Sequence, residues 1–238
     1  MKESQFNRWF NAFILGGMTV ALVLVTCIKF RQAETGRWLL LVSAIGSLAG
    51  VLSSVTSANG RIVTFVFGLI DVSLYAVMCF IGAKYGNAVL HVLYFVPMQF
   101  VGLAQWRKRD ADSTSRVKAR RLTPRQRFAV GAALVLGSAV MWLILHGLGH
   151  SDTPFFDALS VVCNIMGQLL MSLAFMEQWI FWIGVNVASI LMWSLSLAGD
   201  VTSSYAVIYV IKYSFYLVNS FNGLRIWLQL SRNAEVLE

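Results

Sequence analysis

The sequence predicts an all-α integral membrane protein with two parallel three-helix bundles, a linking helix between them, and an additional hydrophobic helix at the N-terminus. Three observations lead to this prediction. The composition is 58% hydrophobic and only 13% charged, whereas a soluble domain carries roughly 25% charged residues. Long apolar runs recur along the whole chain. Sequence elements of the first half also recur in the second half.

The apolar runs each approach the ~20 residues needed to cross ~30 Å of hydrocarbon. Six runs contain no charged residue: Trp9–Ile28, Trp38–Gly60, Tyr85–Trp106, Phe128–Ser151, Ala158–Met176 and Gln178–Gly199. Two more are broken by one charge each, Ile62–Ala83 by Asp71 and Val201–Leu224 by Lys212. We therefore expect eight hydrophobic helices, which leave little chain for a soluble domain.

The basic residues predict the orientation in the membrane. The formal net charge is +8, and nine of the 19 basic residues lie between Arg107 and Arg127. Basic loops beside membrane spans mark the cytoplasmic side, so we expect this loop and the C-terminus to be cytoplasmic. Such clustering favours a topology signal over nucleic-acid binding. The side of the N-terminus stays open, because the first run either spans the bilayer or lies in its interface.

An internal repeat predicts the two bundles. The pattern F-x-G-L-x-x-W occurs at residues 100–106 and again at 221–227, an offset of 121 residues. Upstream, Phe67-x-x-x-Asp71 matches Trp182-x-x-x-Asn186 at an offset of 115 residues. Parallel repeats are a known transporter plan, with the solute site between the halves. The predicted divisions are an N-terminal helix 1–30, a first bundle 37–106, a basic loop 107–127, a linking helix 128–151, a second bundle 155–230 and a tail 231–238.

The uncharged run Gln178–Gly199 carries the strongest candidate site. Its residues Trp179, Trp182, Asn186 and Trp193 fall within roughly 60° of one another on a helix. An amide in hydrocarbon needs a hydrogen-bond partner, and a Trp face attracts cationic rings. The stripe therefore favours a flat, polar, ring-bearing solute. The alternative places Trp179 and Trp193 in the interfacial aromatic belts, which explains Trp182 and Asn186 poorly.

Two charged residues inside predicted spans are further candidates. Lys212 shares a helix face with Tyr216 and Asn219, and it either donates into a cavity or snorkels outward from a shallow position. Asp71, which the repeat pairs with Asn186, either accepts from a sugar hydroxyl, neutralises Lys212, or serves as a buried structural partner.

Uncharged side chains extend the list of candidates. Gln99 lies on one helix face with Trp106. Gln168 follows Asn164 by one helical turn, and the two either line the cavity or hydrogen-bond between helices. Trp106 and Trp227 end their helices, where the interfacial aromatic belt is the favoured interpretation.

Other residues indicate packing only. Gly46-x-x-x-Gly50 predicts close helix packing. The three cysteines lie within apolar runs without a C-x-x-C spacing, and the three histidines show no metal-ligand spacing.

On these residues the chain resembles the PnuC family of nicotinamide riboside transporters. The resemblance is carried by W-x-x-W-x-x-x-N at 179–186, by the Lys212–Trp227 pattern and by F-x-G-L-x-x-W at 100–106. It implies a fold similar to the SWEET sugar transporters, a homotrimer in the bacterial inner membrane, and facilitated diffusion of nicotinamide riboside, an NAD precursor that is then trapped by phosphorylation. It also implies that Trp182 stacks on the pyridinium and Asn186 reads the carboxamide, with Trp179 assisting.

The expected function is a uniporter that works by alternating access. A carrier for another ring-bearing vitamin or nucleoside, such as thiamine or riboflavin, is the alternative. An enzyme is disfavoured because H-E-x-x-H, G-x-S-x-G and paired carboxylates within a span are absent from the sequence, and a sensor would need an output domain. We expect no cofactor, metal site or catalytic residue. The predicted substrate-binding residues are Trp182, Asn186, Trp179, Asn219, Lys212, Tyr216, Gln99, Asp71 and Gln168.

Overall fold

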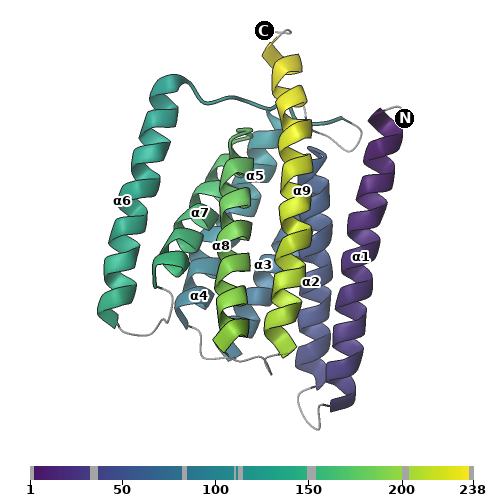
Figure 1. The fold of residues 1–238 in the computed structure, drawn as a ribbon. Helices are drawn as coiled ribbons and strands as arrows, with labels where there is room; N and C mark the ends of the chain where they lie inside the picture. Colours follow the sequence, from purple (N-terminus) through teal and green to yellow (C-terminus); the bar gives the residue numbers. More distant parts are fainter. Residues whose placement is uncertain are drawn as a thin grey trace. The chain divides into compact units, whose positions relative to one another are not determined.

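The computed structural model is helical along almost all of the chain that it describes, which comprises residues 3–32, 37–81, 85–109, 111, 115–148, 154–199 and 204–235. Eight helical segments coincide with the eight predicted runs (Figure 1). They are α1 (Glu3–Gln32), α2 (Arg37–Ala58), α3 (Thr64–Ile81), the continuous α4 (Tyr85–Leu90), η1 (His91–Phe95) and α5 (Val96–Arg107), then α6 (Pro124–Leu148), α7 (Pro154–Ser172), α8 (Gln178–Gly199) and α9 (Ser204–Glu235).

The helices have the length and hydropathy of membrane spans. Within the described residues, six helical segments are long and apolar enough to cross a bilayer, those of α1, α2, α3, α4–α5, α6 and α7. The described apolar stretch of α8, Gln178–Met192, is shorter. The prediction of a multi-pass membrane protein is therefore confirmed by length and composition, and spanning by α8 and α9 stays a prediction.

The chain divides into two units, Met1–Val117 and Lys118–Glu238. In unit 1, α1 packs on α2, α2 on α3, and α3 on α4, η1 and α5. In unit 2, α6 packs on α7, α7 on α8, and α8 on α9. The helix that we predicted as a separate linker thus packs within unit 2, so each unit has a peripheral first helix followed by three more.

The start of α6 is set by a capping box, four residues before the predicted start at Phe128. The backbone N–H of Thr123 donates to Oε1 of Gln126 at 2.9 Å, and the N–H of Gln126 donates to Oγ1 of Thr123 at 3.3 Å. Pro124 occupies the first helical position, where its missing N–H costs nothing. The last two basic residues of the predicted loop, Arg125 and Arg127, therefore belong to α6.

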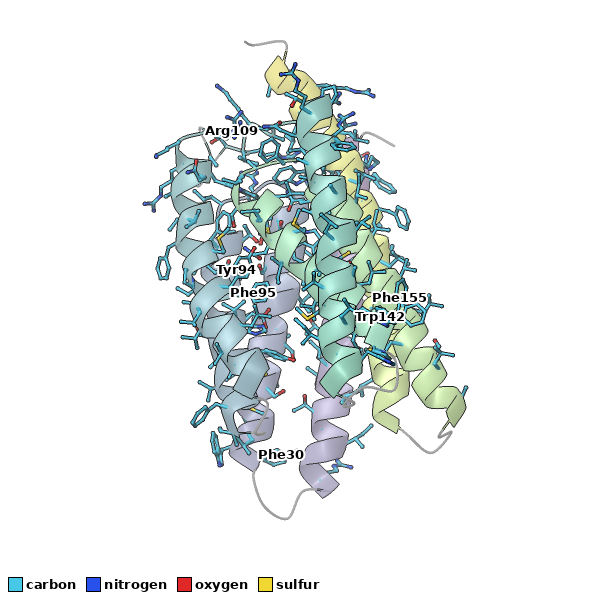
Figure 2. All side chains as sticks on the ribbon, turned by 90° about the vertical axis from the view of Figure 1, so that its left-hand side faces the viewer. Phe30, Tyr94, Phe95, Arg109, Trp142 and Phe155 are labelled. Atoms are coloured by element: carbon cyan, nitrogen blue, oxygen red, sulfur yellow. The ribbon has the colours of Figure 1, made fainter. Side chains whose placement is uncertain are left out.

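Helix α1 runs antiparallel to α2. The side-chain amides of Asn11 and Asn59 donate to each other, both at 3.2 Å, which joins the first third of α1 to the end of α2. The carbonyl of Gly60 accepts from the N–H of Val117 at 3.0 Å. The N-terminal part of α1 therefore lies at the end of unit 1 that carries the basic loop, and Figure 2 shows Phe30 of α1 at the opposite end from Arg109. This geometry favours the spanning alternative for the first helix.

The turn between α2 and α3 has a counterpart between α7 and α8. Gly60 and Ala174 both adopt a positive φ, 66° and 62°. The same backbone bonds surround each of them: Gly60 N–H to Ser57 and Arg61 N–H to Thr56 in one turn, Ala174 N–H to Met171 and Phe175 N–H to Leu170 in the other. Both are helix C-terminal caps closed by a left-handed residue. The offset between the two turns is 114 residues.

This register corrects one prediction from the sequence. We aligned Asp71 with Asn186 at an offset of 115, but the turns that begin α3 and α8 fix the offset at 114. Asp71 therefore corresponds to Val185, and Phe65 corresponds to Trp179. Neither helix contains a gap, so the offset set by the turns holds along the whole of α3 and α8, and the sequence match was wrong by one residue. An error of one residue turns a helix face by about 100°.

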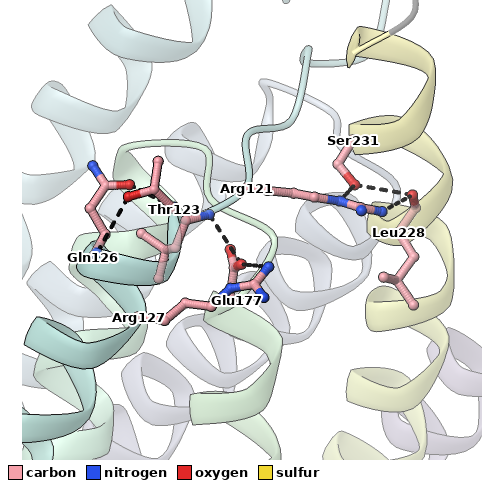
Figure 3. A network of polar contacts seen from close by, with 8 residues as sticks. Arg121, Thr123, Gln126, Arg127, Glu177, Leu228 and Ser231 are labelled. Carbon is pink, nitrogen blue, oxygen red and sulfur yellow. Dashed lines mark hydrogen bonds and ion pairs between the residues drawn. The ribbon is translucent and has the colours of Figure 1, made fainter.

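The basic loop is bound to the α7–α8 turn within unit 2 (Figure 3). Arg120 pairs with the turn through its N–H, which donates to Ala174 at 2.7 Å, and its carbonyl, which accepts from Met176 at 2.9 Å. Its guanidinium lies 4.4 Å from the centre of the Phe175 ring. Glu177 is 5% exposed, and its Oε1 accepts from the Leu122 N–H at 3.1 Å and from Arg127 at 3.3 Å. One buried carboxylate thus joins the loop, the turn and α6.

Replacing Glu177 tests this connection. We expect Glu177→Ala to lower the stability of the purified protein by about 1–3 kcal/mol, because it leaves the buried Leu122 N–H without an acceptor. Arg125→Gln is the matched control, since Arg125 is an exposed basic residue of the same first turn of α6 and exposed charges contribute only about 0–1 kcal/mol. Denaturant or thermal unfolding in detergent measures both, and equal losses in the two variants would contradict the assignment.

Candidate functional site

Asn186 lies on the face of α8 that meets α9. It is 5% exposed, and its Nδ2 donates to Oγ of Ser220 at 3.0 Å. The Ser220 hydroxyl in turn donates to the backbone carbonyl of Tyr216 at 2.8 Å. A buried amide in a membrane protein requires such partners. The contact fixes the orientation of the amide and directs Oδ1 away from Ser220, as an acceptor for a further donor.

Three further predicted residues of α9 lie near this contact in sequence and on the helix. The Nζ of Lys212 lies 5.6 Å from the centre of the Tyr216 ring and 5.9 Å from that of Tyr213. Asn219 is 1% exposed. Lys212 is half-buried, and its ammonium lies against aromatic rings at distances typical of a cation–π contact. The polar face of α9 therefore continues from Lys212 through Tyr216 to the partner of Asn186.

Trp182 lies between α8 and α7. A Cβ built on Gly167 would lie 3.2 Å from two atoms of its indole, so the ring lies flat over this glycine. The indole also packs beside the buried cluster that includes Cys163, Phe181 and Val185, and it is only partly buried. Part of the side chain therefore remains exposed on unit 2.

The other predicted amides of α7 point elsewhere. Gln168 is 5% exposed, and its Nε2 donates to Ser172 Oγ at 3.2 Å. Asn164 donates to the Ser160 carbonyl of its own helix at 2.8 Å. Both are thus held by hydrogen bonds within α7, and the interhelical alternative is not seen among the bonds of the described residues.

Trp179 packs α8 onto α9. A Cβ on Gly223 would lie 2.6 Å from three atoms of its ring, so only glycine leaves room there. The ring meets that of Trp227 edge-on, with centroids 6.4 Å apart. Trp179 is 3% exposed, and its Nε1 has no hydrogen-bond partner among the described residues. A buried indole N–H without an acceptor is an available donor.

The interfacial interpretation of Trp106 and Trp227 is wrong. Both side chains are fully buried, at 0% exposure. Trp106 meets Phe65 edge-on, with ring centroids 4.8 Å apart, and Phe65 lies over Gly102 as Trp179 lies over Gly223. The sequence does not distinguish a Trp that faces lipid from one that faces its own bundle. Here each Trp packs edge-on against an aromatic ring that lies over a glycine of the Trp's own helix.

The unit 1 candidates lie at helix contacts of their own. Gln99 is 4% exposed and reaches α3, where its Oε1 would lie 2.5 Å from a Cβ on Gly68. This Oε1 has no hydrogen-bond partner among the described residues. Asp71 faces α2, with its carboxylate 2.8–3.2 Å from a Cβ on Gly50. Gly46 likewise faces Leu74, so the predicted close packing at Gly46-x-x-x-Gly50 is confirmed.

One feature of unit 1 was missed from the sequence. Residues His91–Phe95 form a π-helical turn, in which the N–H of Val96 bonds back to the carbonyl of His91. Pro97 follows directly, and its ring cannot be accommodated by a regular preceding turn. Single π-turns occur frequently at functional sites. Pro97 inside an apolar run was the sequence signal for this turn. Figure 2 labels Tyr94 and Phe95, the last two residues of the turn.

Across the α8–α9 contact of unit 2 the structure joins Asn186 to Ser220, which bonds to the Tyr216 carbonyl. It places Lys212 beside the Tyr216 ring on α9 and Trp182 on the α7 side of α8. Gln99 and Asp71 belong to unit 1 and are described there alone, so a pairing of Asp71 with Lys212 stays a prediction. The side chain of Trp193 lies outside the described residues. Ser220 and Gly167 are the contacting residues that sequence reasoning had not selected.

Comparison with known proteins shows the family of the chain. Residues 40–229 match the family described as "Nicotinamide mononucleotide transporter". "Nicotinamide riboside transporter PnuC" of Neisseria mucosa is 40% identical over 81% of this chain and 73% of its own length. The Haemophilus influenzae protein of the same name is 31% identical, covering 89% and 88%. A solved structure, "Crystal structure of the Vitamin B3 transporter PnuC", matches with a TM-score of 0.70 and 34% identity over 96% of this chain and 92% of that one.

Substitution of Gly223 tests the packing that positions α9. We expect Gly223→Leu to destabilise the protein by about 1–3 kcal/mol through overpacking against Trp179. Gly131→Leu in α6 is the control, because a Cβ there meets nothing within 4 Å. Thermal unfolding of both purified variants in detergent measures the difference, and a Gly223 variant as stable as the Gly131 variant would refute the packing assignment.

Proposed function

Because the chain belongs to the nicotinamide mononucleotide transporter family, we propose that it is a membrane carrier for nicotinamide riboside. The observation that carries this proposal is the pairing of a partly accessible indole, Trp182, with a buried amide, Asn186, one turn further along the same helix. The first supplies a π face and the second supplies directional hydrogen bonding. The proteins that it resembles are named as transporters of this solute.

The substrate chemistry matches these two side chains. Nicotinamide riboside has a flat pyridinium ring with a fixed positive charge, and a desolvated cation–π contact with Trp contributes about 2 kcal/mol or more. Its carboxamide offers two N–H donors to the Oδ1 of Asn186, whose Nδ2 is already bound to Ser220. The Asn186–Ser220 hydrogen bond therefore orients Oδ1 to accept a hydrogen bond from the carboxamide of the solute.

The other predicted residues complete the proposed site. Lys212, Tyr216 and Asn219 along α9 are assigned to the ribose hydroxyls. Trp179 contributes its unpartnered indole N–H, and Gln168 borders Gly167, on which Trp182 lies. From unit 1 we assign Gln99, through its unpartnered Oε1, and Asp71.

The transport mechanism that we propose is uniport by alternating access of the two three-helix bundles, residues 37–106 and 155–230. The matching turns at an offset of 114 residues support an internal repeat of this kind. We further propose a homotrimer in the bacterial inner membrane with a cytoplasmic C-terminus. The concentration of basic residues between Arg107 and Arg127 supports that orientation.

The family description names nicotinamide mononucleotide, which must be distinguished from nicotinamide riboside as the substrate. It adds a phosphate dianion, and desolvating that charge requires several donors or cations. Among the assigned residues Lys212 is the single cation. We therefore propose the uncharged-ribose form as the substrate, and thiamine or riboflavin carriage stays the alternative.

Uptake of labelled nicotinamide riboside into proteoliposomes tests the function. We expect uptake to equilibrate without an ion gradient or ATP, to be competed by unlabelled nicotinamide riboside, and to be little affected by the mononucleotide, thiamine or riboflavin. Empty liposomes are the control. Strict dependence on a sodium or proton gradient would refute uniport, and equal competition by thiamine would refute the assigned substrate.

Replacing the two central side chains tests the site. We expect Trp182→Ala and Asn186→Ala each to weaken binding of nicotinamide riboside by at least about tenfold, which corresponds to one lost interaction of about 1.4 kcal/mol. Trp142→Ala and Asn233→Ala are the matched controls, since both side chains are exposed. Calorimetric titration of variants that elute as folded protein measures the affinities. Wild-type affinity in both site variants would refute the assignment.

A further inference from the structure

A glycine of α7 lies directly against the indole that we assign to solute binding. Gly167 is buried, and a Cβ built on it would lie 3.2–3.3 Å from three atoms of the Trp182 ring, Cε2, Cζ2 and Cδ2. The three distances are almost equal because the ring lies flat over the backbone of α7. Glycine inside a helix is less favourable than alanine. Its presence at this position therefore needs a packing reason, and the indole supplies one.

The contact covers one face of the indole. Carbon atoms in contact lie about 3.5–4.0 Å apart, so no solute ring fits between Gly167 and Trp182, and only the opposite face of the indole is left for stacking. The side chain of Trp182 is partly exposed on unit 2, and it packs against the buried cluster that contains Cys163, Phe181 and Val185. These neighbours limit sideways movement of the ring. Its distance from Gly167 therefore sets the position of the face that a solute meets.

Unit 1 provides an internal comparison. At the offset of 114 residues that the two turns fix, Gly167 corresponds to Ser53 of α2, and Trp182 corresponds to Gly68 of α3. Here the glycine lies on the other helix of the pair, since a Cβ on Gly68 would lie 3.2 Å from Oγ of Ser53. Where α3 carries no ring, α2 carries a side chain, and where α8 carries an indole, α7 carries none. The glycine at position 167 is therefore required by the ring at position 182 and not by the repeat.

We propose that Gly167 is a positioning residue that determines the specificity of the solute site, a role that rests on the proposed function of Trp182 and Asn186. Asn186 follows Trp182 by four residues, so the two side chains project from adjacent turns of one face of α8. The carboxamide of nicotinamide riboside is attached directly to the pyridinium ring. The depth at which the indole holds that ring therefore decides whether the carboxamide reaches Oδ1 of Asn186. Gly167 sets this depth, and it thereby selects solutes that satisfy both contacts at once.

Gly167→Ala tests this role. The added methyl group would displace the indole away from α7 by a few tenths of an ångström. We expect the affinity for nicotinamide riboside to fall about fivefold, because the stacking and the amide contact cannot then both keep their best distances, and a misfit of about 0.5 Å forfeits roughly a quarter of a contact. The unfolding temperature should stay at or above the wild-type value, since alanine favours the helix where it fits.

Gly184→Ala is the matched control. Gly184 lies at the same α7–α8 contact, and a Cβ there meets only Sγ of Cys163, at an ordinary 3.5 Å, so we expect wild-type affinity. A double variant, Gly167→Ala with Trp182→Phe, tests whether the glycine acts through the indole. The smaller phenyl ring leaves room for the methyl group, so Gly167→Ala should weaken binding less in this background, as contacting residues do. Calorimetric titration measures the affinities, and thermal unfolding in detergent measures the stability.

The remaining outcomes each decide the inference. Wild-type affinity in Gly167→Ala overturns it and leaves the proposed function intact, provided that Trp182→Ala still weakens binding. Equal weakening by Gly184→Ala, or a Gly167→Ala variant that unfolds at a lower temperature or does not fold, assigns the glycine a purely structural role and also overturns it. So does strict additivity with Trp182→Phe. If neither Gly167→Ala nor Trp182→Ala changes the affinity, the proposed site and this inference are both wrong.

Discussion

The packing of a large ring on a glycine is the contact on which the rest of each unit depends. In a bilayer, helices gain little from hydrophobic burial, because lipid tails are as apolar as leucine, so close contact between surfaces must hold them together. Phe65 lies on Gly102 in unit 1 and Trp179 lies on Gly223 in unit 2. A Trp one turn after each glycine, in the repeated F-x-G-L-x-x-W pattern, packs edge-on against the same ring. These contacts set the spacing of α3 against α5 and of α8 against α9.

The polar contact of unit 2 follows from that spacing. Asn186 lies about two turns after Trp179 on α8, and Ser220 lies about one turn before Gly223 on α9. Because the rings and glycines bring the helices close at one level, the amide and the hydroxyl meet 3.0 Å apart at the next. The Ser220 hydroxyl in turn donates a hydrogen bond to the Tyr216 carbonyl. The amide is therefore satisfied within the protein and still retains acceptor capacity at Oδ1.

The sequence predicted the helices because apolar length is a strong signal. An isolated amide in an apolar run singled out Asn186, whose required partner is Ser220. Sequence reasoning failed where two environments share one pattern. Trp106 stands at the end of α5, and Trp227 stands just beyond the apolar run of α9, which continues to Glu235. At both places a belt residue and a buried ring look alike in the sequence. The repeat register was off by one because the deciding feature is turn geometry, and Ala174 at φ 62° carries no sequence signal as Gly60 does. Glu177 was overlooked because a lone carboxylate between two apolar runs usually faces water.

The two matching turns explain why each unit tolerates a peripheral helix. The span of α1 is 11% buried and that of α6 is 0% buried, so neither is held by its apolar surface within the protein. Each is instead joined to the turn of its own unit by polar bonds, α1 through Asn11 and Asn59 and α6 through Arg127 and Glu177. In each unit a residue of the basic loop also bonds to the turn, Val117 to Gly60 in unit 1 and Arg120 to Ala174 in unit 2. Any change in the tilt of α3 or α8 must therefore carry its loop segment and its peripheral helix along, or break these bonds.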